Sequence, residues 1–105
     1  MNALINGTPI YLIQKSEVKW QIEYEIYPIQ LKHALPIADL IANDALFEDI
    51  DVNLVSHAGR VTSILLKAEQ YWFDLAAMSN MIEHRLDELI ESYLFDNGGY
   101  AAIQA

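Results

Sequence analysis

The 105-residue sequence contains no cysteine. This absence excludes disulfides, thiolate catalysis and zinc sites with cysteine ligands. Basic residues are also scarce, because 6 lysines and arginines stand against 15 aspartates and glutamates, giving a net charge of −9. A chain this acidic is repelled by nucleic-acid phosphates and by anionic lipid surfaces, so we expect no direct nucleic-acid binding and no membrane binding. The favourable partner is a basic protein surface.

Motifs for catalysis and for cofactor binding are missing as well. The sequence has only four glycines, and Gly98-Gly99 follow a predicted helix, whereas a phosphate-binding loop opens one. No serine lies in a G-x-S-x-G context. We therefore expect no enzyme activity and no cofactor. Apolar runs are too short to span a membrane, and the opening MNALINGTPIYLIQ lacks the cationic start of a signal peptide, so a cytoplasmic location is expected.

Hydrophobic residues, by contrast, are plentiful at 53%, while charged residues make up 20%. That balance lets a chain of this length bury one core that offsets the entropy of ordering the backbone. We expect a single domain over residues 1–105, in which the tail 100–105 is frayed or adds an edge strand.

The N-terminal half has the pattern of an antiparallel sheet. Asn6-Gly7 lies between two short apolar runs and predicts a tight hairpin. Residues 18–27, VKWQIEYEIY, alternate strictly, which predicts a strand with one buried face and one wet face. The buried face is expected to carry Val18, Trp20, Ile22, Tyr24 and Ile26. Pro28 is expected to end this strand, because proline cannot donate to the ladder.

In the middle of the chain, Pro36 predicts the first turn of a helix that ends near Phe47. The segment EDIDVNLV, residues 48–55, predicts a strand, followed by a turn over residues 57–60. Two secondary structures are compatible with residues 61–76. Helical spacing and the absence of glycine and proline favour a helix, whereas β-branched and aromatic residues favour two strands joined at residues 67–69. The helix is the preferred of the two.

The last helix is expected to begin at Asn80, with Glu83 completing a variant of the capping box, and to end at Asn97-Gly98-Gly99. One apolar stripe runs along it: Ile82, Leu86, Leu89, Ile90, Tyr93 and Leu94. The fold class is therefore α+β: a small antiparallel sheet that starts with an N-terminal hairpin and packs against a short middle helix and a longer C-terminal amphipathic helix.

Acidic residues surround His84 on this helix. The helical period of 100° per residue places His84, Asp87, Glu88 and Glu91 opposite the apolar stripe, facing solvent. A solvated helix face is the plainest interpretation, and one helix rarely supplies the three or four ligands that a metal needs, so no metal site is expected. The candidate partner-binding residues are Glu83, His84, Asp87, Glu88 and Glu91, together with Asp44, Glu48, Asp49 and Asp51.

These observations favour an acidic protein-interaction module that binds and inhibits a basic, nucleic-acid-binding protein, as a nucleic-acid mimic would. In size, acidity and lack of catalytic motifs the chain is similar to small phage-encoded inhibitors such as anti-CRISPR proteins, a resemblance of overall profile without a shared motif. The alternative hypothesis is a structural subunit that forms a homodimer. A small enzyme or metal-binding protein ranks below both.

Overall fold

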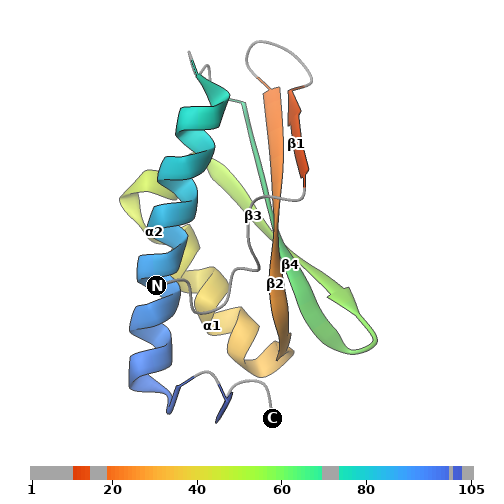
Figure 1. Ribbon diagram of the computed structural model, residues 1–105, viewed down its shortest axis with the longest axis vertical. Coiled ribbons are helices and arrows are strands. Elements are labelled where there is room, and N and C mark those ends of the chain that lie inside the picture. Colours follow the sequence, from red (N-terminus) through yellow and green to blue (C-terminus); the bar gives the residue numbers. More distant parts are fainter. Residues whose placement is uncertain (1–10, 15–18, 70–73, 100, 103–105) are drawn as a thin grey trace.

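Four antiparallel strands form one sheet in the computed structural model of the protein, which describes residues 11–14, 19–69, 74–99 and 101–102 (Figure 1). The strand order is β1-β2-β4-β3, and both helices lie on the same side of the sheet. The elements are β1 (Tyr11–Gln14), β2 (Lys19–Gln30), α1 (Leu31–Ala42), a 3-10 turn (Ala45–Phe47), β3 (Ile50–His57), β4 (Arg60–Glu69) and α2 (Leu75–Asp96). The predicted α+β class is confirmed; the hairpin at Asn6-Gly7 falls outside the described residues.

Strand β2 places alternate side chains on opposite faces of the sheet. Trp20, Ile22, Tyr24 and Ile26 are each at most 3% exposed and face the helices, as predicted from the alternation. We call this side the inner face and the opposite side the outer face. Pro28 does not end the strand as expected. β2 continues to Gln30, because the register against β4 shifts between Glu25 and Ile29, and this irregularity accommodates a proline without a ladder hydrogen bond.

Helix α1 differs from its prediction at both ends. It begins at Leu31, so Pro36 lies inside the helix and not in its first turn. Burial of Ala34, Ile37 and Ile41 along one stripe offsets the hydrogen bond that the proline removes. The helix ends at Ala42, not near Phe47, because the Asp44 carboxylate accepts a hydrogen bond from Leu46 N and starts a separate 3-10 turn.

Strands β3 and β4 form a hairpin at the predicted turn. Ala58 and Gly59 have φ angles of 53° and 80°, and this pair of positive angles matches the twist of a two-residue hairpin.

The preferred helix over residues 61–76 is wrong, since residues 61–69 belong to strand β4. The alternative is right in its first strand, but β4 runs unbroken through the expected join at residues 67–69; residues 70–73 lie outside the described part, and residues 75–76 belong to α2. β4 is the second interior strand of the sheet and pairs with both β2 and β3. The register against β3 shifts between Val55 and Ser56, so β4 carries one extra residue there and its buried residues do not alternate strictly. The step of three from Val61 to Ile64 also fits a helical period.

Helix α2 begins five residues earlier than predicted. Asp74 is its N-cap, and the Asp74 carboxylate accepts a hydrogen bond from Ala77 N at 3.1 Å, so Asn80 lies inside the helix. The C-terminal end is as predicted: Gly98 has a φ of +88°, and Gly99 N donates to Leu94 O at 2.9 Å. No helix in the described part of the chain has the length and apolarity needed to cross a membrane.

One polar contact joins α2 to the sheet inside the core. The Tyr24 hydroxyl, on a side chain with no exposed surface, donates to Ser79 O at 2.9 Å and lies 3.3 Å from Ser79 Oγ. Burial raises the pKa of Tyr24 to about 12, so the hydroxyl stays protonated and remains a donor. The apolar stripe of α2 continues from this contact along the helix, with Ile82, Leu86 and Ile90 fully buried.

Trp20 provides a test of the inner face. Trp20→Ala should lower the free energy of unfolding by about 3 to 5 kcal/mol, because the side chain is 3% exposed and its removal leaves a cavity. Trp20→Phe should cost less, since an aromatic ring remains and the change removes the buried indole N–H, which has no acceptor among the described residues. Urea unfolding measures both values. A Trp20→Ala variant with wild-type stability would contradict the assigned face.

Candidate partner-binding surface

The solvent side of α2 carries three of the nine predicted site residues. Because Ile82, Leu86, Ile90 and Leu94 face the core, His84, Glu88 and Glu91 lie on the opposite side and are exposed. Two apolar residues share this side. Phe95 is 91% exposed and Met81 is 41% exposed. We define the α2 outer row by its spacing along the helix: Met81, His84, Glu88, Glu91 and Phe95.

Glu83 and Asp87 do not lie on the outer row. Both side chains are half-buried on the flank of α2, one turn apart, so the prediction that Asp87 faces solvent fully is wrong. Glu83 Oε1 and Asp87 Oδ1 are buried and have no hydrogen-bond partner among the described residues. Burial, followed by the neighbouring charges of Glu83 and Glu91, raises the pKa of Asp87 to about 6.

The raised pKa of Asp87 has a defined effect on stability. A carboxyl whose pKa is about 6 when folded and about 3.9 when unfolded destabilises the fold above pH 6 and has no such effect below pH 4. Stability should therefore decrease as the pH rises between these values. Asp87→Asn should raise the free energy of unfolding at pH 7 by at most about 1 kcal/mol, since the side chain is only half-buried and solvent screens it.

Chemical unfolding at pH 4 and at pH 7 measures this effect. The exposed Glu48→Gln change is the matched control and should leave stability unchanged at both values. A constant difference between Asp87→Asn and wild type across the two pH values would show that this carboxyl titrates normally in the folded protein.

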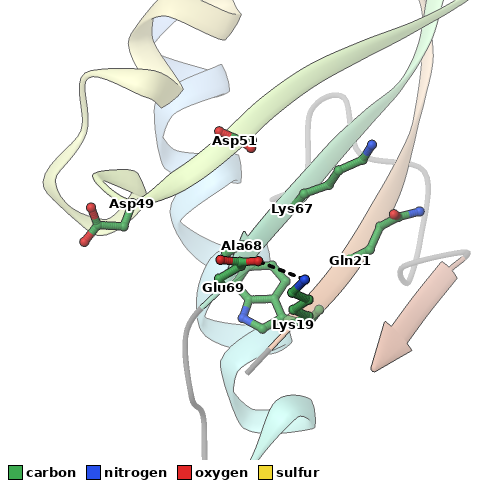
Figure 2. Close-up of a pocket in the computed structure, with 8 residues that line it drawn as sticks. Lys19, Gln21, Asp49, Asp51, Lys67, Ala68 and Glu69 are labelled. Carbon is green, nitrogen blue, oxygen red and sulfur yellow. Dashed lines mark ion pairs between the residues drawn. The ribbon is translucent and has the colours of Figure 1, made fainter. Parts of the chain in front are cut away.

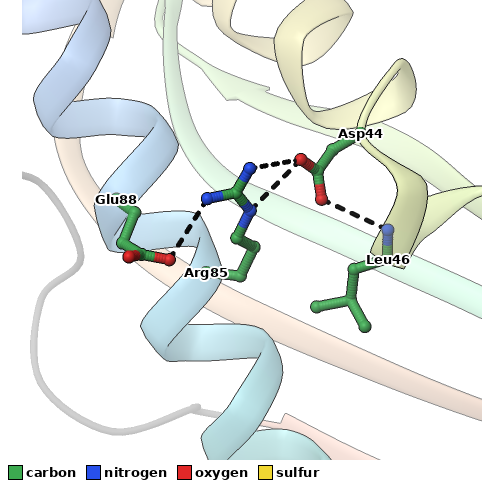
Figure 3. Close-up of polar contacts among 4 residues, drawn as sticks. All are labelled: Asp44, Leu46, Arg85 and Glu88. Carbon is green, nitrogen blue, oxygen red and sulfur yellow. Dashed lines mark hydrogen bonds and ion pairs between the residues drawn. The ribbon is translucent and has the colours of Figure 1, made fainter.

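Asp44 is bound within the molecule. Arg85 Nε and Nη2 donate to Asp44 Oδ1 at 3.1 and 2.6 Å, and Arg85 Nη1 lies 3.2 Å from Glu88 Oε1 (Figure 3). The other Asp44 oxygen accepts from Leu46 N, and the side chain is only 13% exposed. Arg85 lowers the pKa of Asp44, because its guanidinium stabilises the carboxylate. This acid therefore ties α2 to the segment after α1.

The Asp44–Arg85 pair should be energetically coupled. In a double-mutant cycle with Asp44→Ala and Arg85→Ala, the coupling should be favourable, because two donors converge on one half-buried carboxylate. The matched cycle on Lys19 and Glu69, which lie 3.2 Å apart and are 58% and 70% exposed, should give a coupling near zero. Equal couplings in both cycles would contradict a structural role for Asp44.

Asp49 and Asp51 lie on a different surface from the α2 acids. They line a shallow pocket of about 440 Å³ together with Lys19, Lys67 and Glu69 (Figure 2). In the sheet register, Asp51 is opposite Lys67 and belongs to the outer face, away from both helices. Glu48 is exposed just before this group. Acidic and basic side chains alternate here, so the predicted acids do not merge into one patch.

The structure also places the three histidines apart. His33 Nδ1 is hydrogen-bonded to the Tyr93 hydroxyl at 2.7 Å, His57 ends β3, and His84 belongs to the α2 outer row. Among the described residues there is no group of three or more histidine, aspartate or glutamate side chains placed to hold a metal ion.

Sequence reasoning missed Phe95 and Arg85 as site residues. Phe95 follows Glu91 by four residues, so the helical period could have placed it on the acidic side. The Asp44–Arg85 contact joins residues 41 positions apart and has no local signal. Comparison with known proteins adds no relative: no protein-family model, curated protein or solved structure matches this chain.

Proposed function

We propose that the protein is an acidic protein-interaction module that binds a basic surface of another protein through the α2 outer row. The observation that carries the proposal is the position of Phe95, which is 91% exposed on the same side of α2 as Glu88 and Glu91. Exposed aromatic side chains are enriched among the residues that dominate binding energy. Here the aromatic ring lies beside carboxylates that attract cationic partners.

Charge supports the same class of partner. The net charge of −9 steers the chain toward cationic surfaces and away from phosphates. Carboxylates spaced along a rigid helix can complement lysine and arginine side chains that otherwise contact nucleic acid. A nucleic-acid-binding protein is therefore the partner class that we favour, with the chain acting as an inhibitor that occupies its basic surface. Met81 and Phe95 supply apolar contacts at the two ends of the row.

A homodimer is the second candidate function, and one observation favours it. Strand β3 is an edge strand in the described sheet, since it pairs only with β4, and it contains no proline. Such an edge can pair with a second copy by extending the sheet. Measurement of mass in solution at several concentrations separates this function from that of a monomeric binding module.

The triple change Glu88→Gln, Glu91→Gln and Phe95→Ser tests the outer row. Because all three side chains are exposed, the variant should fold like wild type. Its affinity for the basic protein captured by the wild-type chain should fall about tenfold or more, through loss of an aromatic contact and of electrostatic attraction. The affinity of the wild-type chain should decrease with salt, and this dependence should weaken in the variant.

The control variant carries Glu48→Gln, Asp49→Asn and Leu35→Ser, which remove the same number of charges and one exposed apolar side chain elsewhere. Leu35 is 52% exposed and Glu48 and Asp49 are exposed. This variant should bind like wild type. If the control loses affinity and the outer-row variant retains it, the binding surface lies on the other acids and the proposal for α2 is wrong.

A further inference from the structure

Helices α1 and α2 are held together at two separate places. The His33–Tyr93 hydrogen bond connects the start of α1 to the end of α2, and the Asp44–Arg85 pair connects the segment after α1 to the middle of α2. These contacts make the two helices antiparallel neighbours. A groove of about 570 Å³ runs between them.

The walls of this groove have a regular spacing. Each wall consists of four residues at positions i, i+3, i+4 and i+7, which is one ridge along two turns of a helix. The residues are Pro36, Asp39, Leu40 and Asn43 from α1, with Asp44 just beyond, and Leu89, Ser92, Tyr93 and Asp96 from α2. A third helix can pack into the groove between two such ridges that run side by side.

The middle of the groove is apolar and accessible. Leu40 is 40% exposed, Pro36 is exposed, and Leu89 and Tyr93 are half-buried. Because the core beneath them is already filled by residues such as Ile37 and Leu86, these side chains leave apolar surface in contact with solvent. An apolar side chain from a partner would remove that surface from water.

The charged residues that line the groove are all acidic. Asp44 is neutralised by Arg85, but within the described part of the chain Asp39 and Asp96 form no ion pair. Asp39 lies on the α1 wall, and Asp96 lies at the end of α2 that is near His33. Carboxylates next to an apolar floor complement a ligand that has apolar side chains on one face and lysine or arginine beside them.

We propose that the groove between α1 and α2 binds one amphipathic cationic helix of the basic partner, about two to three turns long, whose apolar side chains contact Leu40, Leu89 and Tyr93. This inference rests on the proposed function and specifies the partner element that the chain recognises. In helix-in-groove binding the bound helix supplies anchors at i, i+3, i+4 and i+7. Each wall presents a ridge along about two turns against which such side chains can pack. Asp96 follows Phe95 directly, so the groove and the α2 outer row meet at the last turn of α2.

The probe is a synthetic helical peptide of about 15 residues, with leucine at the positions of one face and lysine elsewhere. It is titrated into the full ¹⁵N-labelled chain, and the amide shifts map the contact. We expect saturable shifts along the groove walls. A second peptide has glutamine in place of every leucine, and a third has glutamate in place of every lysine. The second should shift signals only near the acids, and the third should not bind.

Two leucine variants on α1 provide the matched comparison. Leu40 lines the groove and is 40% exposed, whereas Leu35 does not line it and is 52% exposed. Leu40→Gln should weaken binding of the leucine–lysine peptide about fivefold or more, because an apolar contact is replaced by a polar one. Leu35→Gln should leave the affinity unchanged. Thermal unfolding should show similar stability of the two variants, since both side chains are exposed to a similar degree.

Each result supports or overturns a defined statement. Equal binding by both variants, or shifts outside the groove, overturns the groove inference; the proposed function stands if the cationic peptides still shift the α2 outer row. Binding of the glutamate peptide with equal affinity overturns the requirement for a cationic helix. If neither lysine-containing peptide binds at low salt, both the groove inference and attraction of the acidic surface to basic partners are wrong.

Discussion

The burial of one face of β2 beneath both helices is the constraint on which the rest of the structure depends. Trp20, Ile22, Tyr24 and Ile26 occupy that face, and the apolar stripes of α1 and α2 pack over it. Once these stripes are buried, the helical period determines which residues of α2 reach solvent. The α2 outer row and the groove between the helices both follow from this packing, because the side chains left over from the core form them.

Sequence reasoning predicted the elements whose pattern has a single interpretation. The alternation in residues 18–27 admits only a half-buried strand, and the glycines after Asn97 admit only a helix end. The predicted secondary structure was wrong where the same apolar residues fit both a strand and a helix. The irregular register against β3 changes which residues of β4 face inward, so the buried Val61, Ile64 and Leu66 do not alternate strictly and also fit a helix. The start of α2 was predicted too late because the capping signal at Asn80 and Glu83 lies inside the helix, whereas Asp74 caps it.

The candidate site was predictable to the extent that it depends on local geometry. Exposure of Glu88 and Glu91 follows from the spacing of α2 alone. The ion pair of Asp44 does not follow from local spacing, because its partner is the Arg85 guanidinium from a distant part of the chain. The separation of Asp49 and Asp51 from the α2 acids likewise depends on which face of the sheet each strand residue occupies, and that is settled by register and not by composition. Long-range pairing is the information that a single sequence lacks.

The order of the strands has a consequence for how the chain acquires its structure during synthesis. β4 is interior to the sheet but is the last strand in the described part of the chain, and it lies between β2 and β3. After β2 leaves the ribosome, α1 and β3 are synthesised before β4, which pairs with β2. The edge of β2 that faces β4 therefore stays unpaired until residue 69 emerges. The β3–β4 hairpin forms from local contacts, whereas joining it to β2 closes a much longer loop. Docking of that hairpin onto β2 is therefore the step at which β2 loses its open edge, and α2, which follows in the chain, then completes the core. Before docking, the unpaired edge of β2 is accessible to a chaperone.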